Sequence, residues 1–177
     1  MPEKLRIILV VFGTLPEALV LFLVEGLAQE FDALVLPGEN LPIPAEAYDP
    51  RRRQYRAEAF LSPLASRCRE PLDLVLGVTA LDLFVPRLNF VFGLAELQQN
   101  CAIISVARLD PRFYNQAPDL ALLQERALKE AIHELGHLLG LPHCRDPRCI
   151  MFFSNTLADT DHKGPAFCLA CRGKFPG

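Results

Sequence analysis

One short segment of the chain holds three of its four histidines, with a glutamate between the first two. His133 and His137 are four residues apart, so on a helix they share one face and can direct two imidazoles at the same point. Gly140 is well placed to end that helix, because glycine adopts the left-handed conformation without a steric penalty. The chain can then turn back and bring His143 to the same ion, so the spacing predicts a three-histidine metal site.

Three protein ligands leave a fourth position for water, as in a catalytic rather than a structural zinc site. Glu134 directly follows the first histidine, so its carboxylate can lie beside the metal without binding it. Zinc lowers the pKa of its bound water to about 7, and this carboxylate can take a proton from the water during attack on a carbonyl carbon. The alternative is a buried amphipathic helix with incidental histidines. The spacing favours zinc, since its chance occurrence in such a chain is roughly one in a hundred thousand.

The extended motif resembles that of the metzincin zinc peptidases, in which a methionine-containing turn lies beneath the metal. Met151, eight residues after His143, is placed to be that methionine. Several further residues narrow the resemblance to the archaemetzincin family: Cys144, Cys149, the pair Cys168-Leu-Ala-Cys171 and the segment Val85–Gly93. Apart from that last segment, the similar residues fall roughly between positions 128 and 172.

The resemblance implies a zinc-dependent metallopeptidase that acts on a peptide or protein substrate, with aminopeptidase-like activity where activity is seen in the family. His133, His137 and His143 would bind the catalytic zinc. Glu134 would be the general base and later the proton shuttle, and Met151 would form a hydrophobic floor rather than a ligand. The alternative is a zinc-binding, peptide-recognition module of the same fold with little or no turnover. Hydrolysis of another kind of amide is a third hypothesis.

Four cysteines in the C-terminal part form a second candidate metal site. Cys168 and Cys171 are a C-x-x-C pair, and Cys144 and Cys149 are a looser pair. In a protein without a secretory signal, cysteines are more often thiols or metal ligands than disulfides. Two such pairs can enclose one structural zinc ion, as the family also implies, and would then stabilise a region with little core of its own. Disulfides and a redox pair are the alternatives, and we expect two zinc ions per chain in all.

Composition limits the classes of protein that the chain can belong to. It has 177 residues, which suit one domain with a sizeable core. Hydrophobic residues make up 51% and charged residues 22%, with a net charge of −3. This balance is normal for a globular protein and suggests neither a nucleic-acid groove nor a membrane surface. We therefore expect a monomer with no nucleic-acid or membrane partner.

The N-terminal segment imitates a signal peptide, because Lys4 and Arg6 precede an apolar run. Gly13, Pro16 and Glu17 interrupt that run, so no stretch approaches the ~18 residues of a membrane span. A cleaved signal with so polar a break would be unusual. We therefore expect a buried strand in this segment and a cytoplasmic protein.

Apolar residues recur with strand and helix periodicity in alternation along the chain. Asp119 can serve as the N-cap of the long helix that carries the first two histidines. An apolar stripe at helical spacing on that helix is predicted to lie in the core: Leu128, Ile132, Leu135 and Leu139. We expect strands at 5–12, 33–36, 72–78, 90–94 and 102–106, helices at 16–31, 51–68 and 119–139, and a loop at 37–50.

This alternation argues for an α/β (α+β) fold, a sheet packed on helices rather than a helical bundle. The family resemblance implies a metzincin-like zincin fold, with a twisted mixed sheet above the cleft and the active-site helix beneath it. We expect one domain over residues 1–177, with the sheet and helices in 1–140 and a small zinc-stabilised C-terminal subdomain in 141–177. By the same analogy, the strand at 90–94 would pair antiparallel with an extended substrate; an ordinary edge or interior strand is the alternative.

Smaller candidates carry weaker predictions. Cys68 and Cys101 stand alone in the sequence and are predicted to be small buried hydrophobic side chains. His162 lies in a polar segment and is expected on the surface. Ser154 and Asn155 follow the expected methionine turn and could form hydrogen bonds near the metal.

Overall fold

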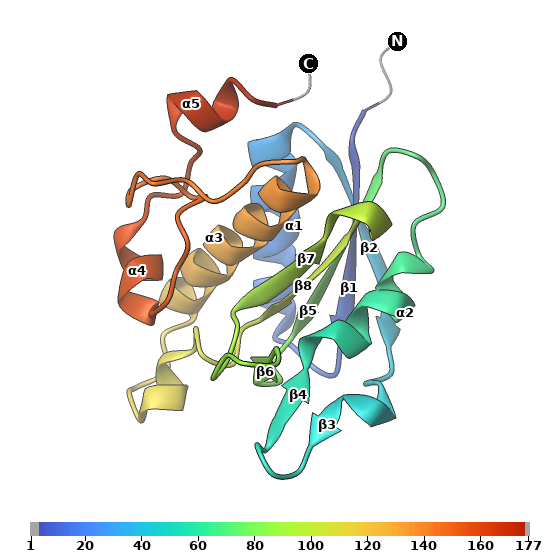
Figure 1. The fold of residues 1–177 in the computed structure, drawn as a ribbon, viewed down its shortest axis with the longest axis vertical. Helices are drawn as coiled ribbons and strands as arrows, with labels where there is room; N and C mark the ends of the chain where they lie inside the picture. The colour runs from blue at the N-terminus through green and yellow to red at the C-terminus, as the bar shows by residue number, and fades with distance from the viewer. Residues whose placement is uncertain (1–3, 176–177) are drawn as a thin grey trace.

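The computed structural model describes residues 4–175 and contains a five-stranded mixed sheet with helices on both faces (Figure 1). The strands are β1 (Arg6–Phe12), β2 (Leu34–Leu41), β3 (Tyr48–Asp49), β4 (Gln54–Arg56), β5 (Asp73–Thr79), β6 (Leu83–Phe84), β7 (Gly93–Glu96) and β8 (Cys101–Ser105). The large sheet has the order β2-β1-β5-β8-β7, in which only β7 is antiparallel to its neighbour. A smaller sheet has the order β3-β4-β6.

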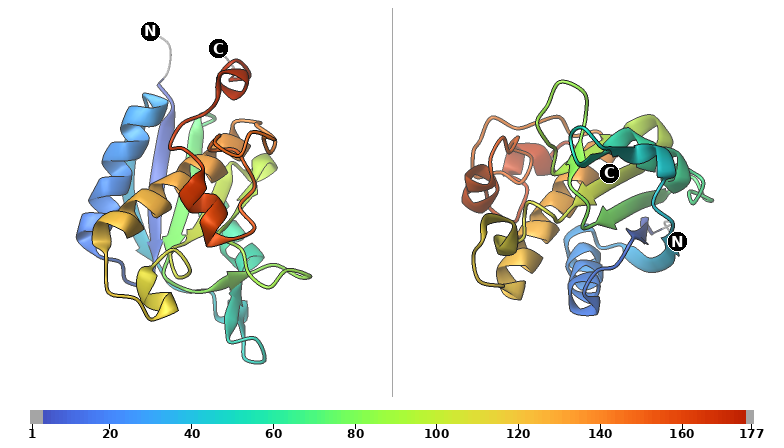
Figure 2. Two further views of the ribbon diagram at one scale, coloured as in Figure 1. Left: turned by 90° about the vertical axis from the view of Figure 1, so that its left-hand side faces the viewer. Right: turned by 90° about the horizontal axis from the view of Figure 1, so that it is seen from below.

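The helices cover the two faces of the large sheet unequally. They are α1 (Glu17–Phe31), α2 (Leu61–Ala65), α3 (Leu120–Leu138), α4 (Leu157–His162) and α5 (Leu169–Arg172), with 3₁₀ turns η1 (Ala45–Ala47), η2 (Ala57–Phe60), η3 (Leu97–Gln99) and η4 (Pro111–Tyr114). The long helices α1 and α3 lie side by side on one face, while α2 and η2 lie on the other (Figures 1 and 2). The mixed α/β fold expected from the sequence is confirmed.

Alternation along the strands builds two buried clusters. Ile7 and Leu9 of β1 pack toward α1 and α3, and Val10 and Phe12 pack toward α2 and η2. Every residue of β5 is buried, because both faces of the central strands are covered. The strands predicted at 5–12, 72–78 and 102–106 are each confirmed to within one residue at either end.

The C-terminal part does not have a core of its own. Ile150, Met151 and Phe167 are buried in the same cluster as the sheet and the two long helices. Residues 141–175 therefore pack against α3 as a layer, in which α4 and α5 are short helices joined by irregular chain. Among residues 4–175, no helix has the length and apolar character needed to cross a membrane.

Helix α3 forms where the sequence predicts it, because its signals are local. The Asp119 side chain accepts a hydrogen bond from the backbone N–H of Leu122 at 3.0 Å, as an N-cap does. The helix gives way at Leu139, and Gly140 adopts a φ of +87°. Its apolar stripe packs in the core as expected. Ile132 and Leu135 are buried, and Leu128 and Leu139 are half-buried.

In the first half of the chain one strand is longer than predicted, and one predicted helix is wrong. The strand predicted at 33–36 continues to Leu41 through Pro37, since β2 is an edge strand on which a missing N–H is tolerated. The helix predicted at 51–68 is replaced by a turn, β4, η2 and the short α2. Arg53 has a φ of +56°, which ends any helix, and Tyr55 pairs with Leu83 in the small sheet. The pairing of β4 with a distant strand outweighs the helical spacing of its apolar residues.

Candidate metal centres and cleft

Helix α3 and the chain that follows it bring the three predicted histidines together. His133 is buried, His137 is half-buried and His143 is exposed, and their candidate ligand atoms all lie within 4.8 Å of one another. The ring centroids of His133 and His137 are 4.7 Å apart, as are those of His137 and His143. The turn at Gly140 thus returns the chain to the helix face that carries the first two rings.

Hydrogen bonds fix which nitrogens of these rings are available. Nδ1 of His133 donates to the carbonyl of Ile150 at 2.8 Å, and Nδ1 of His137 donates to the carbonyl of Leu141 at 2.8 Å. In the neutral rings both Nε2 atoms therefore carry a lone pair. Burial favours the neutral form, because it lowers the pKa of His133 well below its ordinary value and lowers that of His137 as well.

The separation of the two lone-pair atoms fits a metal ion. The Nε2 atoms of His133 and His137 lie 3.2 Å apart, a distance at which two lone pairs repel unless a cation lies between them. Two nitrogens bound to tetrahedral zinc at about 2.0 Å would lie about 3.3 Å apart. The donor set and its spacing therefore fit a zinc ion with imidazole ligands.

Glu134 lies under the edge strand of the large sheet. Its side chain is buried, and a Cβ placed on Gly93 of β7 would lie 2.5 Å from its Oε1. Burial, with a smaller contribution from Glu130, raises the pKa of Glu134 to about 8 against the opposing effect of Lys163. A carboxylate in such a place is a better proton acceptor than an exposed one.

Met151 lies beneath α3 and connects the histidine region to the cysteines. Its side chain is fully buried, and a Cβ on Gly136 would lie 2.5 Å from its sulfur. Its backbone N–H donates to Sγ of Cys149 at 3.5 Å, and its carbonyl accepts from the N–H of Cys144 at 2.9 Å. Met151 thus lies in a turn, with its sulfur against Gly136 of the helix that carries His133 and His137.

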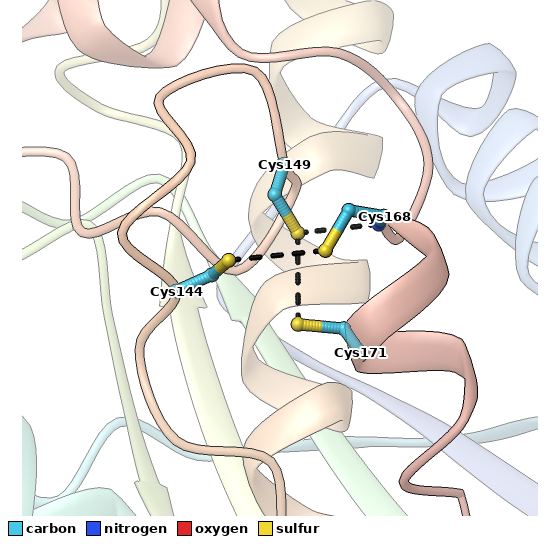
Figure 3. Close-up of side chains that lie close together, drawn as sticks. All are labelled: Cys144, Cys149, Cys168 and Cys171. Atoms are coloured by element: carbon cyan, nitrogen blue, oxygen red, sulfur yellow. Dashed lines mark hydrogen bonds between the residues drawn. The ribbon is translucent and has the colours of Figure 1, made fainter.

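The four C-terminal cysteines point their sulfurs toward a common centre (Figure 3). Sγ of Cys144 lies 3.8 Å from Sγ of Cys168, and Sγ of Cys149 lies 3.8 Å from Sγ of Cys171. A disulfide requires about 2.05 Å, whereas two sulfurs bound to tetrahedral zinc at about 2.3 Å would lie about 3.8 Å apart. The geometry fits a four-sulfur zinc site and excludes the disulfide alternative in this structure.

Backbone N–H groups also favour thiolates in the cysteine cluster. Sγ of Cys144 accepts from the N–H of Asp146 at 3.5 Å, and Sγ of Cys149 accepts from the N–H of Cys168 at 3.4 Å. A hydrogen bond from the backbone of Cys171 lowers the pKa of Cys168 to about 7, whereas burial raises the pKa of Cys149 and that of Cys171. Such donors stabilise a negative sulfur, which is the form that binds zinc.

A groove of about 510 Å³ runs between β7 and the histidines. The strand predicted at 90–94 starts three residues later and ends two residues later, at Gly93–Glu96, and Phe90 and Phe92 belong to the segment that leads into it. The N–H of Ser105 donates to the carbonyl of Phe92, so in this antiparallel pair Gly93 and Ala95 direct their N–H and C=O groups to the free edge. β7 is an edge strand of the large sheet. The sequence had not distinguished an edge strand from an interior one.

The smaller predictions have mixed outcomes. Cys101 is buried as predicted, but Cys68 is only half-buried, with its Sγ 3.6 Å from the carbonyls of Glu70 and Asp73. His162 is exposed as predicted, although it ends α4 rather than lying in a loop.

Sequence reasoning missed a buried ion pair beside the histidines. Lys163 Nζ lies 3.1 Å from Oε1 of Glu130, and both side chains are almost wholly buried. Glu130 is four residues before Glu134 and shares its helix face, a spacing that could have drawn attention to it. Lys163 carries no comparable signal, because only the fold brings it to α3.

Comparisons with known proteins define the class first. The structure superposes on a zinc-dependent peptidase from Methanocorpusculum labreanum with a TM-score of 0.86 and 33% identity, covering 95% of this chain and 98% of that one. It superposes on an archaemetzincin from Methanopyrus kandleri with a TM-score of 0.84 and 38% identity, covering 96% of this chain and 92% of that one. The fold is therefore that of a zinc peptidase.

The family follows from the sequence. The profile of Peptidase family M54 matches residues 34–176. The archaemetzincin of Pyrococcus furiosus is 45% identical over 175 residues, which are 96% of this chain and 91% of that protein. The chain belongs to the archaemetzincins, Peptidase family M54, a family of zinc metallopeptidases. The family expected from the cysteine and histidine spacing is confirmed.

Proposed function

We propose that the chain hydrolyses peptide bonds at the histidine cluster, with zinc held by Nε2 of His133 and His137 and by His143. The observation that carries this proposal is the pair of Nε2 atoms facing each other at 3.2 Å while both Nδ1 groups are engaged elsewhere. Zinc bound there would polarise a substrate carbonyl and make an attacking water more acidic. Proton transfer and substrate binding depend on the side chains and backbone around the metal.

Glu134 is the general base in this proposal. Its buried carboxylate accepts the proton of the attacking water and then donates a proton to the amine that leaves. The free edge of β7 binds the substrate, because Gly93 and Ala95 offer N–H and C=O groups to an extended chain running antiparallel to the strand. Met151 supports α3 from below as a buried hydrophobic contact.

The cysteine cluster has a structural part in this proposal. Four sulfurs leave no open position on a tetrahedral ion, so such a site binds neither water nor substrate. It would join the segment after α3 to the start of α5 and hold residues 141–175 against the helix. Two zinc ions per chain would therefore have two separate purposes.

Replacing Glu134 with glutamine tests the catalytic assignment. The Glu134→Gln variant keeps the shape of the side chain but removes the base, so we expect full zinc content and a loss of hydrolysis of at least about a hundredfold. Glu125→Gln is a matched control on an exposed turn of the same helix. Unchanged turnover of a peptide library by Glu134→Gln would exclude the mechanism.

The choice of substrate is tested with the same library. Peptides with free and with blocked N-termini separate aminopeptidase-like cleavage, which we propose for this chain from its family resemblance, from cleavage within a chain. Retained peptide binding without turnover in the zinc-loaded wild-type protein would favour a recognition module instead.

A further inference from the structure

A pocket of about 220 Å³ adjoins the groove, next to the segment that leads into β7. It includes His133 but not the other two histidines, and it is continuous with the groove through the residues that line both: Leu88, Val91, Gly93, His133, Glu134 and Phe153. Three phenylalanines line it, and the rings of Phe90 and Phe92 pack edge to face at 5.0 Å. The pocket is therefore a recess with aromatic and polar walls beside the proposed reaction centre, large enough for one side chain.

Glu130 places an incompletely paired carboxylate in that recess. Its side chain is only 3% exposed, and its Oε1 accepts from the Thr160 hydroxyl at 3.1 Å and lies 3.1 Å from Lys163 Nζ. Its other oxygen, Oε2, has no hydrogen-bond donor among residues 4–175. Oε2 is not one of the buried polar atoms that lack a partner, so it keeps accessible surface and can accept a hydrogen bond from a group that enters the pocket.

The pocket is lined by acidic side chains and, among the described residues, by no lysine or arginine. The carboxylates are those of Glu130 and Glu134. Lys163 lies behind Glu130 with no exposed surface and is directed to the oxygen that Thr160 also contacts. Oε2 is thus left as a fixed acceptor in a recess with aromatic walls.

The direction of the substrate places one of its residues here. This step rests on the proposed function, in which an extended substrate runs antiparallel to β7. The strand runs from Gly93 to Glu96, so the C-terminal direction of the substrate leads toward Phe92 and Phe90. The side chain of the substrate residue on the C-terminal side of the cleaved bond therefore lies at this pocket.

We propose that Glu130 is a specificity-determining residue and that the pocket takes a basic side chain, lysine or arginine, from the residue that follows the scissile bond. The aliphatic stem of such a side chain packs against the phenylalanine rings, and its cationic head donates to Oε2 of Glu130. Norleucine fills the same space as the lysine stem but brings no donor, so it isolates the contribution of the carboxylate.

Two peptide hydroxamates provide the test, one with lysine and one with norleucine directly after the zinc-binding group. Their binding to the zinc-loaded protein is measured by calorimetry, which does not require turnover. We expect the lysine compound to bind about tenfold more tightly or better. In Glu130→Gln the ratio should fall close to one, with zinc content and norleucine affinity unchanged, whereas Glu125→Gln should keep the wild-type ratio.

Equal affinity of both compounds for the wild-type protein would overturn the proposal, even if Glu130→Gln does not fold. A lysine preference that persists in folded Glu130→Gln would overturn the assignment to this residue. Failure of both compounds to bind would instead reject the metal site of the proposed function, and this proposal with it.

Discussion

The histidine cluster and the cysteine cluster hold their donor atoms at zinc-like separations but differ in how completely they enclose the centre. Three imidazoles, one of them exposed, face an open groove under β7. Four sulfurs converge from the turns around Cys144 and Cys149 and from the start of α5, and would leave no position open on a tetrahedral ion. An open donor set permits chemistry, whereas a closed one can only hold the chain together.

The two clusters also differ in what fixes their donors. His133 and His137 stand on one rigid helix whose apolar stripe is packed in the core. The cysteines come from short turns and from the start of α5, a helix of only 4 residues. Removing the metal should therefore disturb the cysteine region far more than the histidine region.

The largest effect is expected from breaking the closed site. Cys171→Ser should remove one zinc ion per chain and lower the free energy of unfolding by at least about 4 kcal/mol, because the ion contributes folding energy. Denaturant unfolding and elemental analysis measure the two effects. Cys68→Ser, outside the cluster, is the control and should change neither. A Cys171→Ser protein with wild-type stability and zinc content would show that the cluster is not a metal site.

Removing a histidine of the open site should reduce hydrolysis strongly and stability little, the reverse of the cysteine variant. His143→Ala should reduce peptide hydrolysis at least about a thousandfold, since the metal contributes several kcal/mol to the transition state. Unfolding should change little, because the ring is exposed and no core packing is lost. His162→Ala, an exposed histidine away from the cluster, is the matched control. A drop in the free energy of unfolding as large as that of Cys171→Ser would contradict the distinction between a catalytic and a structural site.

Disturbing the groove without touching a donor should have an intermediate effect. In Gly93→Ala the new Cβ would lie only 2.5 Å from Oε1 of Glu134, so the Glu134 carboxylate must move. A misplaced base should lower kcat/KM by about tenfold to a hundredfold with zinc content intact. Gly173→Ala, whose Cβ would meet only ordinary contacts, should behave as wild type. Wild-type kinetics for Gly93→Ala would argue against Glu134 as the base.

The smallest effect separates general destabilisation from loss of metal. Asp119→Ala removes the N-cap of α3 and should cost about 1 kcal/mol of stability, with both zinc ions retained. Asp119→Asn should keep most of that stability, because asparagine also caps helices. Loss of zinc in Asp119→Ala would mean that metal content depends on overall stability alone. Zinc content could then not distinguish the histidine site from the cysteine site.

The parts of the molecule that were predictable are those with local causes. Spacing along one helix placed His133 and His137 together, a capping residue set the start of α3, and Gly140 set its end. Cysteine spacing, supported by the family resemblance, indicated the four cysteines, and the resemblance indicated Met151. Each histidine or cysteine pair is close in the sequence, although Cys144 and Cys168, 24 positions apart, meet only in the fold.

The parts that were missed depend on distant contacts. Gln54 donates to the carbonyl of Asn89 at 2.8 Å, and this tie helps hold β4 in a segment predicted to be helical. The start of β7 is set by its register with β8 rather than by its own apolar pattern. The Glu130–Lys163 pair joins residues 33 positions apart, and it defines the pocket that we assign to a basic side chain.

Zinc content combined with X-ray absorption spectroscopy tests the two-site description most directly. The fully metallated wild-type protein should hold two zinc ions per chain, one with four sulfur neighbours at about 2.3 Å and one with nitrogen and oxygen neighbours at about 2.0 Å. His143→Ala should lose only the second signal. A single zinc ion per chain, or a spectrum with sulfur neighbours alone, would contradict the separation into an open catalytic site and a closed structural one.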